Sequence, residues 1–167
     1  MSDILKAIGN TPIVKLKNIV PIGCGEIYVK LEAFNPTGSK KDRMALSMIL
    51  GAEKRGVLKK GMTVVEYSGG STGAGLAFVC SLKGYNFRLV TADVFGKEKI
   101  DFMRSLGANL EIIKSSSGKI NKELITKMIK KADQISKEPN TFFTNQLNNT
   151  DVIEGFIPLG EEILDQL

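Results

Sequence analysis

Two adjacent lysines, Lys40 and Lys41, have the clearest potential for chemistry in this sequence. They follow the turn sequence NPTGS, and Ser39 with Asp42 three residues later has the spacing of a helix-capping pair, so we expect a helix from about Lys40. Lys41 then lies one helical turn before Ala45, on the apolar stripe of that helix. The spacing predicts that Lys41 points inward and that Lys40 lies on a mixed face that reaches solvent.

An amine that points toward the core is costly unless it is paired, neutralised or covalently bonded. One interpretation is that Lys41 extends outward to solvent or pairs with a carboxylate such as Glu32. The other is that Lys41 is a neutral amine that forms a Schiff base with a carbonyl compound. The dipole of a helix N-terminus disfavours a cation and favours the second interpretation. The residues alone leave both open.

A second candidate is the glycine-rich stretch YSGGSTGAG, Tyr67–Gly75, which follows a predicted strand and opens a predicted helix. Backbone amides and the helix dipole converge on an anion at such a position. The candidate binding residues are Ser68, Gly69, Gly70, Ser71 and Thr72. The stretch lacks the P-loop and GxGxxG spacings, so a carboxylate is favoured over a nucleotide pyrophosphate. The alternative is a turn that carries glycine for geometry alone.

The sequence of 167 residues contains no histidine, which excludes histidine bases and most catalytic zinc sites, and we expect no metal. The net charge of +5 comes from lysines spread along the chain without interleaved aromatics, which indicates anionic small molecules as ligands rather than nucleic acid.

No apolar run is long enough to cross a bilayer or to form a signal peptide, so we expect no membrane partner and a cytoplasmic protein.

These candidate residues need a scaffold, and from Met44 onward the apolar pattern alternates between helical and extended periods. That alternation is typical of an α/β fold, here a doubly wound, mostly parallel sheet with helices on both faces. The expected helices are 40–55, Ser68–Gly73 leading into a helix to Lys83, 97–106, 120–135 and 151–167, the last interrupted by Pro158; the expected strands are 63–66, 87–91, 108–114 and 141–144.

The first part of the chain has a different pattern. Ile13–Leu16 and Ile27–Leu31 are short strand-like runs with Pro21-Ile22-Gly23 between them and no helix, which predicts a β-hairpin. This hairpin need not belong to the same sheet as the later strands.

Several stretches together resemble the cysteine synthases, which belong with cystathionine β-synthase to one group of pyridoxal-phosphate enzymes. The resemblance covers essentially the whole chain in order and spacing. The stretches are IGNTPIVKL at Ile8–Leu16, KLEAFNPTGSKKDR at Lys30–Arg43, VVEYSGGSTGAGLA at Val64–Ala77, KIDFMRSLGA at Lys99–Ala108 and NQLNN at Asn145–Asn149.

The resemblance implies that Lys41 forms a Schiff base with pyridoxal 5'-phosphate and later removes the α-proton of an amino acid, with the cofactor ring as electron sink. It implies that the loop from Ser68 to Thr72, with Gln146, binds the substrate carboxylate. At the position of Ser71 the family most often has asparagine, which hydrogen-bonds the hydroxyl oxygen on the cofactor ring. At the position of Gly69 it frequently has serine. The implied reaction is β-replacement on an activated serine, such as O-acetylserine, with sulfide to give cysteine.

Family members continue well past the length of this chain, and the resemblance places their phosphate-binding loop in that further part. We therefore expect residues 1–12 and 35–145 to form an N-terminal α/β domain, and 13–34 and 146–167 to be elements of an incomplete C-terminal cofactor domain, including the hairpin. The expected assembly is a homodimer. Two alternatives stay open: a catalytically silent fragment or interaction module, and a cystathionine β-synthase-like or O-phosphoserine- or serine-using enzyme.

Overall fold

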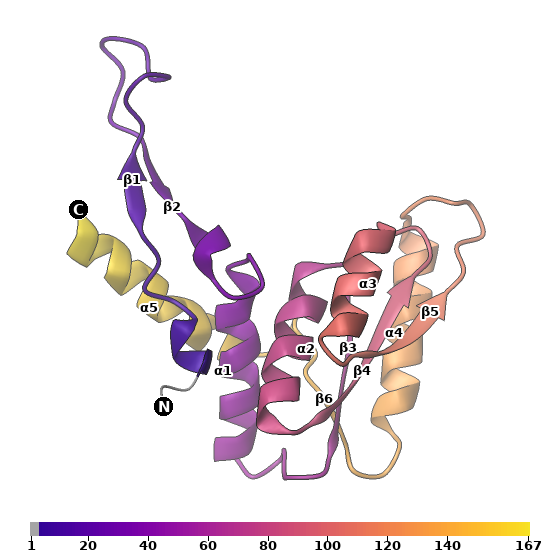
Figure 1. Cartoon of the computed structure of the whole chain (residues 1–167). Coiled ribbons are helices and arrows are strands. Elements are labelled where there is room, and N and C mark those ends of the chain that lie inside the picture. The colour runs from indigo at the N-terminus through magenta and orange to yellow at the C-terminus, as the bar shows by residue number, and fades with distance from the viewer. Residues whose placement is uncertain (1–3) are drawn as a thin grey trace.

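The computed structural model describes residues 4–167 (Figure 1), so residues 1–3 of the predicted N-terminal domain lie outside the described residues. The 3₁₀ helices are η1 (Ile4–Ala7) and η2 (Glu32–Phe34). The strands are β1 (Ile13–Lys15), β2 (Tyr28–Lys30), β3 (Thr63–Tyr67), β4 (Asn86–Ala92), β5 (Asn109–Ile113) and β6 (Thr141–Phe143). The α-helices are α1 (Lys41–Lys54), α2 (Ser71–Lys83), α3 (Lys97–Ser105), α4 (Lys122–Ser136) and α5 (Asp151–Gln166).

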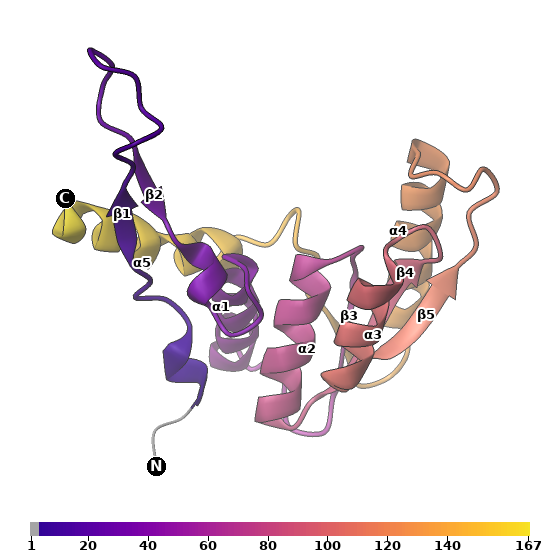
Figure 2. The same ribbon diagram turned by 45° about the horizontal axis from the view of Figure 1, so that its top comes forward.

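The main sheet has four strands in the order β5-β4-β3-β6, and every neighbouring pair is parallel. Helices α2 and α3 lie on one face and α4 lies on the other (Figures 1 and 2). This arrangement confirms the predicted α/β fold with a parallel sheet and helices on both faces. Because the strands are parallel, their carboxyl ends meet at one edge, where the loop after β3 and the segment after β6 lie side by side.

Alternate residues of each central strand supply the two cores, as the two-residue period of a strand requires. Val64 and Leu89 belong to the core under α1, α2 and α3, whereas Val65 and Val90 belong to the core under α4. The α4 side is completed by Leu124, Met128, Ala132 and Ile135, all members of the predicted apolar stripe.

Helix α1 packs between α2 and α5, which lies across it (Figures 1 and 2). Two glycines allow α5 to approach so closely. A Cβ atom on Gly51 would lie 2.5 Å from the Asp151 carboxylate, and one on Gly155 would lie 2.9 Å from the carbonyl oxygen of Arg43. Helix α5 continues through Pro158, where the sequence predicts an interruption.

The N-terminal boundary of α1 differs from the prediction. The helix begins at Lys41, and Lys40 precedes it without a side-chain cap. The Ser39 hydroxyl accepts a hydrogen bond from the Lys41 amide at 3.2 Å, but the Asp42 carboxylate binds Thr37 instead of reaching back to Ser39. The predicted capping pair is therefore wrong in both members: Lys40 and not Ser39 is the residue that precedes the helix, and Asp42 binds the amide and hydroxyl of Thr37 in the turn.

Strands β1 and β2 pair antiparallel, with Val14 opposite Val29, and this confirms the predicted hairpin. The hairpin forms a separate two-stranded sheet that extends away from the main sheet (Figures 1 and 2). The C-terminal part of α5 contacts its base, where Lys30 lies 2.7 Å from Glu162. The division into 1–12 with 35–145 and 13–34 with 146–167 stays a prediction. Among residues 4–167, no helix is both long and apolar enough to span a bilayer.

Candidate active site

The first turn of α1 separates the two lysines of the KKDR sequence. Lys40 is exposed and Lys41 is half-buried, with its Nζ 5.9 Å from the centre of the Phe156 ring on α5. Within the described part of the chain, no carboxylate lies within 4.0 Å of the Lys41 amine. Glu32, the predicted alternative partner, is bound by Arg43, Thr11 and Asn35 instead. The Lys41 amine is therefore half-buried without a counter-ion.

Asp42, the next residue, holds the NPTGS turn in place. Its carboxylate is fully buried and accepts the backbone amide of Thr37 at 2.7 Å, and the Thr37 hydroxyl as well. Burial raises the pKa of Asp42, whereas the two hydrogen bonds from Thr37 oppose that rise. Asp42 thereby fixes the turn that leads directly into Lys41.

Arg43 joins three parts of the chain. Its guanidinium is buried and binds Glu32 with Nε and Nη2 at 2.9 Å each. It also binds Glu162 of α5 with Nη1 and Nη2 at 2.7 Å each. The hydrogen bonds from Arg43 are the main reason that the pKa of Glu162 is lowered to about 2. Arg43 therefore links α5, through Glu162, and the segment after the hairpin, through Glu32, to the helix that carries Lys41.

Three donors at the end of the glycine-rich loop between β3 and α2 have no acceptor among residues 4–167. The Ser68 hydroxyl accepts the amides of Gly70 at 3.2 Å and Gly73 at 3.1 Å, so Ser68 organises the loop itself. The amides of Ser71 and Thr72 begin α2 and have no acceptor in residues 4–167, and the exposed Ser71 hydroxyl likewise makes no hydrogen bond there. Free amides at a helix N-terminus are suited to bind an anion.

Gln146 meets this loop from the segment after β6. Its side-chain oxygen accepts the Thr72 hydroxyl at 2.8 Å, and its side-chain nitrogen donates to the carbonyl oxygen of Tyr67 at 3.0 Å. Residues separated by 74 positions in the sequence thus lie together at the carboxyl edge of the sheet. The predicted set Ser68, Gly69, Gly70, Ser71, Thr72 and Gln146 is contiguous in the structure.

Gly75 brings this loop next to Lys41. A Cβ atom on Gly75 would lie 3.2 Å from the carbonyl oxygen of Lys41 and 3.1 Å from an oxygen of Asp42. The first turn of α1 is therefore in close contact with α2 one turn after α2 begins. The Lys41 turn and the free amides of α2 are neighbours, and they come from two helices that pack together at their N-terminal ends.

Comparison with known proteins identifies the family of the chain. Residues 4–167 match the family described as pyridoxal-phosphate dependent enzymes. The chain belongs to this family. The cysteine synthase of Staphylococcus aureus is 40% identical over 149 residues, which cover 89% of this chain and 46% of that protein.

Solved structures of pyridoxal-phosphate family relatives agree with the fold. The crystal structure of a hydrogen sulfide-producing enzyme from Fusobacterium nucleatum has a TM-score of 0.88 at 36% identity, covering 99% of this chain and 52% of that one. The crystal structure of O-ureido-L-serine synthase has a TM-score of 0.86 at 36% identity, with coverage of 99% and 50%. The chain spans about half the length of the relatives it matches.

Gly69, where the resemblance implies a frequent serine, has no room for a side chain in this structure. A Cβ atom at this position would lie 2.2 Å from the ring of Phe95, which occupies the space that a serine side chain needs. Gly69 and Phe95 are therefore a matched pair, and the sequence alone did not show that Phe95 fills this space.

Sequence reasoning also missed Glu66, which positions Gln146. The Glu66 carboxylate is fully buried; one oxygen accepts the Tyr67 amide at 2.8 Å. The other accepts the Thr144 hydroxyl at 2.7 Å and the Gln146 amide at 2.9 Å. The available signal was a single carboxylate within the otherwise apolar strand sequence VVEY, because a charge there needs buried partners.

We expect Glu66→Gln to lower the free energy of unfolding by about 1–3 kcal/mol, because one accepting oxygen becomes a donor that faces another donor. Burial is the main cause that raises the pKa of Glu66 above its ordinary value of 4.5. The unfolded carboxyl thus ionises at lower pH than the folded one, so the contribution of Glu66 to stability decreases as the pH rises above 4.5. The glutamine variant should lack that decrease.

Urea titrations at several pH values test this expectation, with Glu123→Gln on the exposed surface of α4 as the control. The control should unfold almost as the parent protein does, because its ion pair with Lys127 is exposed. Equal stability of Glu66→Gln and the parent would show that other contacts hold Gln146.

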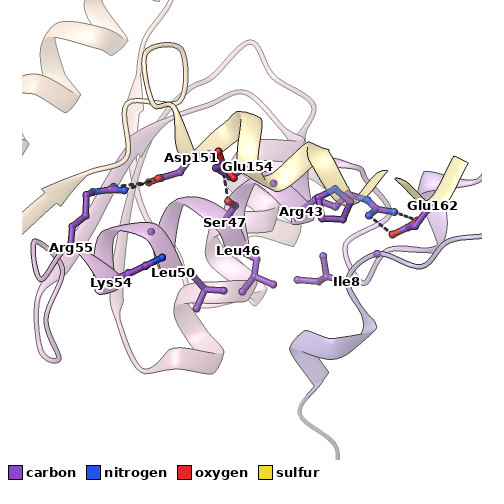
Figure 3. Close-up of a pocket in the computed structure, with 14 residues that line it drawn as sticks. Ile8, Arg43, Leu46, Ser47, Leu50, Lys54, Arg55, Asp151, Glu154 and Glu162 are labelled. Atoms are coloured by element: carbon purple, nitrogen blue, oxygen red, sulfur yellow. Dashed lines mark hydrogen bonds and ion pairs between the residues drawn. The ribbon is translucent and has the colours of Figure 1, made fainter. Parts of the chain in front are cut away.

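Two cavities lie near these residues. The larger, of about 750 Å³, is a groove between α1 and α5 with Ile8, Leu46 and Leu50 among its lining residues (Figure 3). Four of its charged residues pair across it, Arg43 with Glu162 and Arg55 with Asp151, and Lys41 lines neither cavity. The smaller, of about 190 Å³, is lined by Gly70 and Ser71 of the glycine-rich loop. The smaller cavity is therefore the one that adjoins the candidate active site.

Proposed function

We propose that this chain carries the amino-acid-binding part of a pyridoxal-phosphate-dependent enzyme that replaces the β-substituent of an activated serine, such as O-acetylserine, with sulfide to give cysteine. The observation that carries this proposal is the half-buried Lys41, whose amine has no counter-ion among residues 4–167 and whose helical turn packs against the start of α2 and its free amides. Similarity to the cysteine synthases supports the sulfur chemistry.

The residues present fit the cofactor's reactive end. An amine without an ion pair can bond an aldehyde, whereas an amine held in a salt bridge would first have to leave its carboxylate. The Ser71 hydroxyl, unbonded among the described residues, can donate to the oxygen of the cofactor ring. The resemblance places the phosphate-binding loop in the half of the relatives that this chain does not span. The proposal therefore concerns the bond at Lys41 and the amino acid site.

Each residue of the site then has a distinct task. The amides of Ser71 and Thr72 bind the substrate carboxylate, and Gln146 holds the Thr72 hydroxyl in place. The carboxylate is thereby fixed beside the turn that carries Lys41, which orients the substrate before reaction. Nζ of Lys41 takes the proton from the substrate α-carbon. When bound, pyridoxal phosphate supplies a ring that accepts the electrons left at that carbon.

The proposal is tested by adding pyridoxal phosphate to the chain and recording its visible absorption. We expect a visible band that changes on addition of O-acetylserine or O-phosphoserine and recovers when sulfide is added, with cysteine detected as the product. Serine, which has a poorer leaving group, should change the band without yielding cysteine at a comparable rate. No band, or a band that no activated serine alters, would overturn the proposal and favour a catalytically silent module.

A further inference from the structure

The small cavity beside the glycine-rich loop has a polar wall and an apolar wall. Gly70, Ser71, Thr37 and Lys99 line it together with Ala74, Phe102 and Met103. Its volume of about 190 Å³ is several times the ~30 Å³ that one water molecule occupies in the liquid. It can therefore take a substituent of several non-hydrogen atoms next to the residues assigned to the amino acid.

Lys99 contributes the only charged side chain among the residues that line this cavity. The aliphatic part of the Lys99 side chain lies beside the glycine-rich loop, since a Cβ atom on Gly70 would be 3.9 Å from Lys99 Cδ. Of the other charges of α3, Asp101 binds both Lys97 and Arg104, and Glu98 has no ion pair among residues 4–167. In the part of the chain that the structure describes, no carboxylate lies within ion-pair distance of Lys99.

A second polar group faces the cavity without a partner. Ser71 lines it, and its hydroxyl makes no hydrogen bond to any residue from 4 to 167. Thr37, by contrast, is engaged by Asp42 through both its amide and its hydroxyl. One unpaired cation and one unpaired hydroxyl thus share a cavity at the start of α2, where the helix dipole also favours negative charge.

We propose that this cavity is an anion subsite that holds the β-substituent of the substrate, and that this substituent is a phosphate ester. The proposal rests on the proposed function and narrows its substrate to O-phosphoserine. A neutral acetyl group offers the exposed Lys99 amine no charge-assisted hydrogen bond, whereas a phosphate ester accepts one from it. In the reaction the bond between the substrate Cβ and its ester oxygen breaks, its electron pair leaves with the phosphate, and the α-proton passes to Lys41.

The test measures binding to the chain without pyridoxal phosphate, by following amide resonances of the glycine-rich loop during titration. The probes are O-phosphoserine, O-acetylserine and inorganic phosphate, and the proteins are the parent, Lys99→Met and Lys97→Met. Lys97 is a matched control because it is a lysine in the same turn of α3, is paired with Asp101 and does not line the cavity.

We expect O-phosphoserine to bind the parent about tenfold more tightly than O-acetylserine does, and Lys99→Met to remove that preference. Lys97→Met should keep the preference. If both variants lose the preference for O-phosphoserine equally, the preference reflects the general positive charge of the surface, and the proposal is overturned. Binding of inorganic phosphate as tight as that of O-phosphoserine would also overturn it, because the cavity would then not recognise a substrate.

The visible band of pyridoxal phosphate separates this proposal from the proposed function. In Lys99→Met we expect the band to remain, because Lys41 is intact. If the parent shows the band but no preference for O-phosphoserine, the subsite is wrong and the proposed function stands. If the preference depends on Lys99 and the parent shows no band, the subsite stands and the proposed function is wrong.

Discussion

Lys41→Ala is expected to abolish the visible band that pyridoxal phosphate gives with this chain, while Lys40→Ala leaves it intact. The structure gives the reason: Lys41 is half-buried in the turn that packs against the start of α2, whereas Lys40 is exposed and precedes the helix. An enzyme that depends on this covalent bond should lose essentially all turnover with the lysine. Absorption spectra of the purified variants measure the effect.

The two lysine variants are a matched pair, since both remove one positive charge at the same end of the same helix. Circular dichroism should show that both variants fold, because the Lys41 amine makes no hydrogen bond or ion pair within residues 4–167. Loss of the band in both variants, or in Lys40→Ala alone, would contradict the assignment. So would a band that survives in Lys41→Ala.

Arg43→Ala should lower the free energy of unfolding by about 3–5 kcal/mol, because it leaves two partly buried carboxylates without their shared cation. Only 4% of the Arg43 side chain is exposed, and the residue binds Glu32 and Glu162 with paired contacts. Lys30 still lies 2.7 Å from Glu162 and limits the loss. Denaturant titration measures the stability, and hydrogen exchange of the α5 amides measures whether α5 separates from α1.

Arg55→Ala is the control for Arg43→Ala. Arg55 also binds a carboxylate of α5 through two nitrogens, that of Asp151, but half of its side chain is exposed. Asp151 is itself buried, so this variant also leaves a carboxylate without its cation, but it does so at one site instead of two and removes a half-exposed cation, so it should lose less stability than Arg43→Ala. Equal losses in the two variants would show that the burial of Arg43 does not matter.

The pH dependence of stability gives the Arg43 prediction a second readout. Glu162 has a folded pKa of about 2 and an ordinary value of 4.5, so the folded carboxylate ionises at lower pH than the unfolded one. Its contribution to stability is complete above 4.5 and is lost as the pH falls toward 2. In Arg43→Ala this acid-side loss should be smaller, because the main cause of the lowered pKa is gone.

The fold could be predicted from the sequence because its signals are local. The apolar stripe of α4 and the short, largely apolar runs of β3 and β4 depend on the side chains of a few consecutive residues. The hairpin followed from two strand-like runs without a helix between them. The error at the start of α1 arose where two patterns competed, since Asp42 could bind Ser39 or Thr37 and the turn geometry brings Thr37 closer.

The residues of the candidate site also differ in whether a local sequence signal predicts them. Lys41 could be selected by helical phase, and the loop by its glycines between a strand and a helix. Arg43 and Glu66 could not, because their partners Glu162 and Gln146 lie 119 and 80 residues away. A charged residue in a short motif shows that a partner is needed, but only the packing of α5 and the pairing of β3 with β6 show which one.

The central claim, that Lys41 is the residue that bonds the cofactor, is tested most directly by identifying the modified lysine. Sodium borohydride reduction after incubation with pyridoxal phosphate makes the bond permanent, and mass spectrometry of the peptides then locates it. The account predicts a phosphopyridoxyl group on Lys41, with little on Lys40 or Lys99. A label that is spread over the exposed lysines, or concentrated on a residue other than Lys41, would contradict it.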